Sequence, residues 1–149
     1  MNKNINIAVP RLANIWGIVK KECSNKGLDV RLSCVARSQE EQCALYLRGR
    51  YPLDAIAVLY FTIFRQTLTN KTNVIVTRTI YSKHVITENG QLSHALDFYI
   101  CKGGEAIWDV KADVNDDNKG DYVQVAEMFE KLGCRSGRSW GDICHVEIV

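Results

Sequence analysis

Residues 95–110, Ala-Leu-Asp-Phe-Tyr-Ile-Cys-Lys-Gly-Gly-Glu-Ala-Ile-Trp-Asp-Val, contain two apolar stretches separated by a glycine-rich turn. Aromatic and β-branched residues favour strands, and a short turn that contains Gly favours antiparallel pairing of the segments on either side. We therefore predict a hairpin formed by residues 95–101 and 106–110, with its turn at residues 102–104. Asp97 would sit on the sheet that this hairpin begins.

Helix and strand patterns alternate on both sides of the hairpin. Apolar residues recur at helical spacing in several segments and alternate with polar residues in others. The predicted helices lie at residues 10–25, at 39–47 after a Ser38/Glu41 capping box, within 51–73 and before Gly133. The other predicted strands lie at residues 28–34, around 74–76 and at 143–148. We expect one compact α+β domain over residues 1–149, with a small antiparallel sheet flanked by helices.

Composition excludes several classes of function. The chain is 46% hydrophobic and 24% charged with a net charge of +2, so no nucleic-acid surface is expected. Six cysteines without a Cys-x-x-Cys pair favour reduced thiols over a Cys-type zinc site. The start lacks the apolar core of a secretory signal, and the most apolar run, residues 55–64, is too short to span a membrane. We expect a cytoplasmic protein without stable membrane association.

Two histidines and a carboxylate supply the composition of a catalytic zinc site. His84, Asp97 and His145 would leave one position of a tetrahedral ion open for water. Zinc lowers the pKa of its bound water to around 7, and a nearby carboxylate can accept the proton of that water. Asp142, three residues before His145, can take this part. No His-Glu-x-x-His helix is present, so a structural histidine remains the alternative at each position.

Four short segments occur in an informative order. Residues 37–50 read Arg-Ser-Gln-Glu-Glu-Gln-Cys-Ala-Leu-Tyr-Leu-Arg-Gly-Arg. Residues 82–84 read Ser-Lys-His, residues 93–97 Ser-His-Ala-Leu-Asp, and residues 142–145 Asp-Ile-Cys-His. Together they resemble the D-alanyl-D-alanine carboxypeptidase and bacteriophage L-alanyl-D-glutamate peptidase family, with its Arg-Ser/Thr-x-x-x-Gln segment and its Ser-x-His, Gly-x-Ala-x-Asp and Glu/Asp-x-x-His motifs.

The resemblance implies roles for five residues. His84, Asp97 and His145 would hold Zn²⁺, and Asp142 would act first as general base and then as general acid. Arg37 would steady the carbonyl oxygen of the substrate, where a guanidinium is effective because negative charge grows there in the transition state. The implied protein is a zinc peptidase that hydrolyses bacterial peptidoglycan.

The chain also departs from the family pattern. The interval between His84 and Asp97 is longer than in many relatives, which predicts a loop over residues 85–91 and makes His94 a rival ligand. In an extended segment His94 and Asp97 are three residues apart and point to opposite faces, so we favour His84. Asp142 stands where many members have Glu, a change shared with phage members.

Three functions follow from the resemblance as alternatives. We favour a bacteriophage or prophage endolysin, a monomer that cleaves the L-alanyl-D-glutamate bond after another protein opens the membrane. A D-alanyl-D-alanine dipeptidase or carboxypeptidase would instead clamp a terminal carboxylate, for which Arg135 and Arg138 are candidates. A non-catalytic, zinc-stabilised wall-binding module is the third alternative, but it would be expected to lack Asp142.

Two further features are weaker. Residues 113–121 present oxygen ligands at alternating positions, as in the first half of a Ca²⁺ loop, but lack the glutamate at position twelve. A solvated acidic turn is the alternative to a Ca²⁺ site. Trp108 and Trp140 are candidates for the core or for a substrate groove, and we favour Trp140 for the groove because it lies two residues before Asp142.

Overall fold

The computed structural model describes residues 1–87 and 89–149. Its helices are α1 (Pro10–Asn25), α2 (Gln39–Leu47), α3 (Leu53–Phe64) and α4 (Asp121–Lys131), with short 3-10 turns η1 (Ile5–Ile7) and η2 (Arg138–Trp140). Its strands are β1 (Asp29–Cys34), β2 (Ala95–Lys102), β3 (Glu105–Ile107), β4 (Cys134–Gly137) and β5 (Asp142–Ile148). The predicted α+β class is confirmed.

The strands form one antiparallel sheet with β2 at its centre. The order is β1-β2-β5-β4, and β3 pairs with the end of β2. Strand β1 runs along one edge of β2, while β5 and β3 share the other edge. The predicted hairpin of β2 and β3 is therefore confirmed, although β3 ends at Ile107. The chain turns away there because the Asp109 carboxylate accepts a hydrogen bond from the Lys111 N–H at 2.9 Å.

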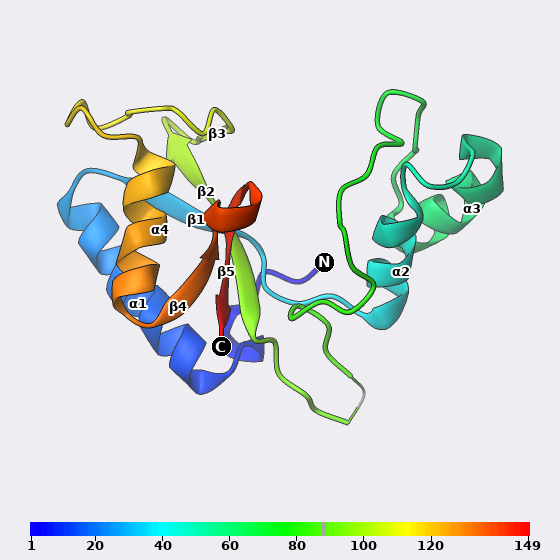
Figure 1. Ribbon diagram of the computed structural model, residues 1–149, viewed down its shortest axis with the longest axis horizontal. Coiled ribbons are helices and arrows are strands. Elements are labelled where there is room, and N and C mark those ends of the chain that lie inside the picture. The colour runs from blue at the N-terminus through cyan, green and yellow to red at the C-terminus, as the bar shows by residue number, and fades with distance from the viewer. Residues whose placement is uncertain (88) are drawn as a thin grey trace.

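Helices α1 and α4 cover one face of the sheet (Figure 1). Alternation along β2 points Leu96, Phe98 and Ile100 into this core, where Phe98 stacks between Tyr122 and Phe129 of α4. Each such fully buried side chain contributes about 1.5–3 kcal/mol relative to exposure. The residues between them, including Asp97, point to the opposite, open face.

A second apolar cluster joins α2 to α3 on the other side of the sheet from α1 and α4 (Figure 1). The capping box of α2 is present in full, because Ser38 accepts from the Glu41 N–H and Glu41 accepts from the Ser38 N–H. Leu45, Ile56 and Tyr60 form the contact between the two helices. This lobe lies beside the open face, and the segments that connect the lobe to the sheet run along that face.

The strand predicted around residues 74–76 is wrong. Outside residue 88, the segment 65–94 contains no helix or strand of its own, and Val74 to Val76 are exposed. Its carbonyls are held by side chains, since Arg48 donates to Thr72 and Arg50 donates to Thr77. Gly49 lets the segment approach closely: a Cβ there would lie 2.4 Å from the Ile75 nitrogen. The predicted loop over residues 85–91 includes residue 88, which lies outside the described residues.

Strand β4 was not predicted from the sequence. Its residues, Cys-Arg-Ser-Gly, have low strand propensity and directly follow a glycine that ends a helix.

The cysteines and the helices bear on two further expectations. All six cysteines are free in the structure. In the described part of the chain, no helix combines the length and apolar character required to cross a membrane.

Candidate metal centre and active site

Three side chains from separate parts of the chain meet on the open face of the sheet. His84 Nε2 lies 3.1 Å from Asp97 Oδ1 and 3.2 Å from His145 Nδ1. The third distance, from His145 Nδ1 to Asp97 Oδ1, is 3.0 Å. Two nitrogens and one oxygen thus form a nearly equilateral triangle, which we call the donor triangle.

The backbone explains why these three side chains meet. Asp97 of β2 and His145 of β5 lie directly opposite each other in the antiparallel register, so their side chains share one face. His84 comes from the segment before β2 and is fixed at the end of β1. Its carbonyl accepts from the Arg37 N–H at 2.9 Å, and its Nδ1 lies 2.9 Å from the Val35 carbonyl oxygen.

Hydrogen bonds on their outer nitrogens orient both imidazoles toward the triangle. The Val35 carbonyl can only accept a hydrogen bond, so His84 Nδ1 carries a proton and Nε2 is the nitrogen that faces the triangle. His145 has the reverse arrangement, because its Nε2 faces Glu147 Oε2 at 3.2 Å. Tetrahedral zinc with bonds of about 2.0–2.1 Å places neighbouring nitrogen and oxygen ligands about 3.3 Å apart. The donor triangle fits that spacing.

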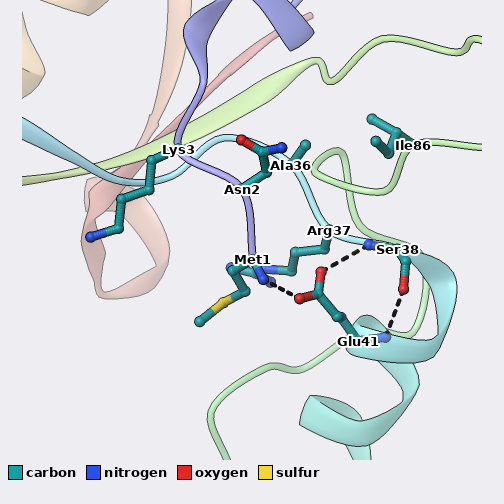
Figure 2. A pocket seen from close by; sticks show the side chains of 8 residues that line it. All are labelled: Met1, Asn2, Lys3, Ala36, Arg37, Ser38, Glu41 and Ile86. Carbon is teal, nitrogen blue, oxygen red and sulfur yellow. Dashed lines mark hydrogen bonds and ion pairs between the residues drawn. The ribbon is translucent and has the colours of Figure 1, made fainter. Parts of the chain in front are cut away.

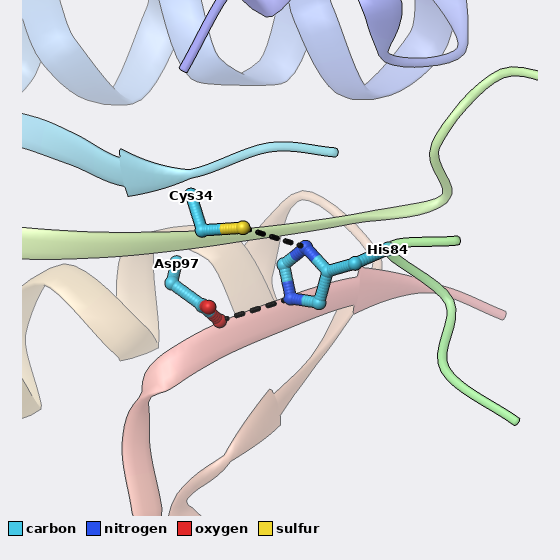
Figure 3. A group of neighbouring side chains, drawn as sticks. All are labelled: Cys34, His84 and Asp97. Atoms are coloured by element: carbon cyan, nitrogen blue, oxygen red, sulfur yellow. Dashed lines mark hydrogen bonds and ion pairs between the residues drawn. The ribbon is translucent and has the colours of Figure 1, made fainter. Parts of the chain in front are cut away.

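Cys34 offers a second donor set that sequence reasoning did not weigh. Its Sγ, one atom of His84 and one oxygen of Asp97 all lie within 4.8 Å of one another. However, Sγ lies 3.9 Å from His84 Nδ1, while Asp97 contacts Nε2 on the other side of the ring (Figure 3). Since Nδ1 is already paired with Val35, the geometry favours His145 over Cys34 as the third donor.

Charge holds the cluster together. Burial alone would raise the pKa of Asp97, but the adjacent His84 and His145 outweigh this effect and keep it well below its usual range. Burial alone would lower the pKa of His84, yet the Asp97 carboxylate beside it raises that pKa to about 10. A metal ion therefore has to displace a proton from His84 to bind there.

Arg37 borders both the donor triangle and an open pocket. Its Nη2 donates to Asp97 Oδ2 at 3.0 Å, and its Nη1 donates to Gln42 Oε1 at 3.0 Å. Gln42 is itself fully buried and donates to the Thr79 carbonyl at 2.7 Å. The pocket beside Arg37 has a volume of about 470 Å³ and is also lined by Lys3 (Figure 2). Gln42 thus positions the guanidinium, a role that needs α2 and the 65–94 segment together.

Comparison with known proteins bears on this site. No family model matches the chain. Over 139 residues the chain is 30% identical to the peptidoglycan L-alanyl-D-glutamate endopeptidase CwlK of Bacillus subtilis (strain 168), with 88% of this chain and 67% of that protein covered. The chain belongs to the zinc D-alanyl-D-alanine carboxypeptidase and L-alanyl-D-glutamate peptidase family. This family membership agrees with the resemblance of the four sequence segments.

Asp142, the expected general base of this peptidase family member, opens β5 at the rim of the site. Its pKa is raised, first because part of its surroundings is desolvated and then because of the negative charge of Asp97. Its backbone is held close to Gly137 of β4, where an added Cβ would fall 2.0 Å from the Asp142 carbonyl oxygen. The absence of a side chain at Gly137 therefore allows β4 to approach Asp142 this closely.

Glu147 and Arg135 form a layer behind His145. Glu147 is buried, with one oxygen on His145 Nε2 and the other on the Arg135 guanidinium. The Arg135 guanidinium lies 4.9 Å from the ring centre of Trp140, whose ring is 5.9 Å from that of His145. Trp140 thus lies beside His145, and its role in a substrate groove stays a prediction. The only sequence signal for Glu147 is its place two residues after His145, on the same side of β5.

Arg135 and Arg138 are both occupied by acidic partners in the structure. Arg135 pairs with Glu147, and Arg138 pairs with Glu130 at 2.8 Å and with Glu127 at 3.3 Å. A carboxylate clamp for a dipeptidase or carboxypeptidase would have to compete with these acidic partners. This observation weakens the alternative functions that end at a terminal carboxylate.

Two expected alternatives gain no support. Among the described residues, the His94 ring makes no hydrogen bond to Asp97 or His145, although the backbone of His94 pairs with Lys83 and Ile148. The 113–121 loop closes on itself, because the Asp113 carboxylate accepts from the N–H groups of Asp117 and Asn118. In the part of the chain that the structure describes, the loop gathers no set of three acidic donor atoms, so a Ca²⁺ site is not supported.

Proposed function

We propose that this protein is a zinc-dependent peptidase that hydrolyses the L-alanyl-D-glutamate bond in the stem peptides of bacterial peptidoglycan. The donor triangle of His84, Asp97 and His145 is the observation that carries the proposal. The relative CwlK is a peptidoglycan L-alanyl-D-glutamate endopeptidase, and its similarity extends over 88% of this chain. The substrate and the bond are taken from that relative and from the shared motifs.

Each residue of the site has a defined task in this proposal. Zinc held by the donor triangle would supply Lewis-acid chemistry and acidify water at the scissile carbonyl. Asp142 accepts the proton of the attacking water on its carboxylate and returns it to the nitrogen of the leaving D-glutamate.

Arg37 stabilises the charge that grows on the substrate carbonyl oxygen. Its guanidinium stands between Asp97 and the open pocket, and its buried Nε–H has no partner among the described residues. A positioned donor of this kind lowers the barrier because it interacts more strongly with the transition state than with the substrate. The neutral amide of Gln42 holds the guanidinium there without neutralising its positive charge.

An endopeptidase is favoured over an enzyme that removes terminal residues. The candidate clamp arginines are paired with Glu147, Glu127 and Glu130, and the pocket beside Arg37 is open to solvent. A binding module without catalysis would have no need for Asp142 beside Asp97. The proposal extends to an endolysin role, in which a monomer stays in the host cytoplasm until another protein opens the membrane.

Digestion of purified peptidoglycan tests the reaction directly. We expect mass spectrometry to find stem peptides that begin with D-glutamate. The glycan strands should keep L-alanine with a free carboxyl group on their muramyl sugars. Asp142→Asn is the matched control, since it keeps the size of the side chain and should release neither product. Release of free D-alanine or of its dipeptide without new L-alanine ends would exclude the endopeptidase. Separating the cytoplasm from the envelope before and after lysis tests the location.

A further inference from the structure

A half-buried tyrosine and an exposed tryptophan form an aromatic pair on the same face of the sheet as the donor triangle. Tyr99 follows Asp97 by two residues on β2, so both side chains point to the open face and their Cα atoms are about 6–7 Å apart. The ring of Trp108, just after β3, stacks on that of Tyr99 with centroids 5.5 Å apart and planes 27° apart. Trp108 nevertheless remains 62% exposed.

The pair is continuous with the candidate active site. The Lys3 ammonium lies 5.9 Å from the centre of the Tyr99 ring. Lys3 also lines the pocket that Arg37 borders (Figure 2), so Lys3 links the surroundings of Arg37 to the ring of Tyr99. In contrast, the aromatic residues of the core, such as Phe98, point to the opposite face of β2.

The core does not account for this pair. Trp108 contributes to neither of the two buried clusters, and most of its indole faces water. A single exposed apolar residue would need no explanation. Two stacked rings at a fixed distance from a catalytic cluster form a flat platform of the kind that binds a ligand through one face.

We propose that Tyr99 and Trp108 form a subsite for the N-acetylmuramyl sugar that carries the stem peptide. The inference rests on the proposed function. The residues that flank the scissile bond offer a methyl group and a carboxylate, neither of which can cover an indole. The sugar has a flat face of C–H groups, and its oxygens can accept hydrogen bonds from Lys3. It is the group on the substrate that matches the platform.

The distances agree with this assignment. L-alanine is joined to the sugar through a short lactyl link, so the pyranose ring begins about two residue lengths from the scissile carbonyl. An extended residue spans about 3.3–3.6 Å, which places the ring beside Tyr99 when the carbonyl is at Asp97. The bound glycan would then lie along the open end of β2, away from the lobe of α2 and α3.

The test compares two soluble substrates that differ only in the sugar. One is a disaccharide that carries the stem peptide, and the other is the same peptide with an acetylated amino end. We expect Trp108→Ala to lower kcat/KM for the sugar-bearing substrate about 3- to 10-fold, mainly through KM. This is the fold-change in binding that the loss of one aromatic stack produces. The free peptide should change less than about twofold, and Trp108→Tyr should restore most of the loss.

The possible outcomes separate this inference from the proposed function. An equal loss on both substrates, or no loss on either, would overturn the sugar subsite while leaving the peptidase intact. If the unaltered protein cleaves neither substrate, the proposed function fails and binding decides the inference. Calorimetry with a peptide-free N-acetylglucosaminyl-N-acetylmuramyl oligomer should then show binding that Trp108→Ala weakens at least threefold. Equal binding by both proteins would overturn it.

Discussion

Glu147 holds the side of the His145 ring that faces away from the donor triangle, with Oε2 3.2 Å from Nε2. The same ring directs Nδ1 toward Asp97 at 3.0 Å. Burial would raise the pKa of Glu147, but the hydrogen bond from His145 and the charge of Arg135 outweigh it and lower that pKa. An ionised Glu147 therefore fixes both the orientation and the tautomer of the His145 ring, as carboxylates behind metal-bound histidines do.

The first prediction concerns this carboxylate. Glu147→Gln keeps the shape of the side chain but removes the charge that orients His145, so zinc affinity should fall about 10- to 100-fold. Competition with a chromophoric chelator measures this affinity without using activity. Glu105→Gln, an exposed change on β3, is the control and should bind zinc like the unaltered protein. Undiminished affinity in Glu147→Gln would show that Glu147 only supports the fold.

The second prediction separates the two histidines that the long interval before Asp97 brings into competition. His84→Ala should lose both bound zinc and activity, because His84 Nε2 completes the donor triangle. His94→Ala should keep both, since its backbone contacts remain possible without the ring. Metal analysis of the two purified variants decides the matter. Full zinc content in His84→Ala with loss in His94→Ala would mean that the ligand was assigned to the wrong residue.

The third prediction is that the roles of metal binding and proton transfer can be separated at Asp142. Asp142→Asn should retain zinc, because the donor triangle does not include this residue. Its rate should fall about 10²- to 10⁴-fold, the usual contribution of a positioned general base. Single-turnover kinetics on a defined stem peptide, with zinc content measured in parallel, provide the check. A near-normal rate would require another base.

The fourth prediction is the pH dependence that follows from the raised pKa of Asp142. The carboxyl of Asp142 in the zinc-free protein should therefore titrate above the value of about 3.9 for a free aspartate. Bound zinc should lower this pKa, because a divalent cation is the largest charge near the carboxyl. Carbon-13 NMR of the aspartate carboxyls, with Asp142→Asn to assign the signal, measures the pKa with and without zinc. A zinc-free pKa at or below the free value would contradict the desolvation of Asp142.

Local signals explain how much of the fold could be predicted. The capping box of α2 and the turn between β2 and β3 are set by residues within a few positions, and both appeared as expected. Strand β4 depends instead on pairing with β5, which no pattern within Cys134–Gly137 announces. The strand predicted around Val76 is wrong for the opposite reason. Its apolar alternation is a local pattern, but the carbonyl of Thr77 accepts its hydrogen bond from the side chain of Arg50 instead of from a neighbouring strand.

The same distinction applies to the candidate site. Sequence motifs selected His84, Asp97 and His145, and the fold brings the three together. Their assignment as zinc ligands stays a prediction. The supporting contacts of Gln42 and Glu147 could not be predicted, because each joins elements far apart or depends on which face of a strand is open.

The last prediction tests whether β4 positions the general base. Gly137 has a φ of −74°, which any residue can adopt, but its added Cβ would fall 2.0 Å from the Asp142 carbonyl oxygen. Gly137→Ala should therefore displace Asp142, and a shift of about 1 Å at a reacting group costs on the order of 10²-fold in rate. Stability should fall by about 1–3 kcal/mol, as for other overpacked positions.

Zinc binding should survive this change, because Asp97 and His145 pair through the other edge of β5. Gly120→Ala is the matched control: its φ is −60°, and the nearest atom to its added Cβ is 3.8 Å away. We expect the control to keep its rate, while Gly137→Ala shows normal zinc content, a lower melting temperature and a reduced kcat. Loss of zinc would place the disturbance at His145 instead, and an unchanged kcat would mean that β4 does not position Asp142.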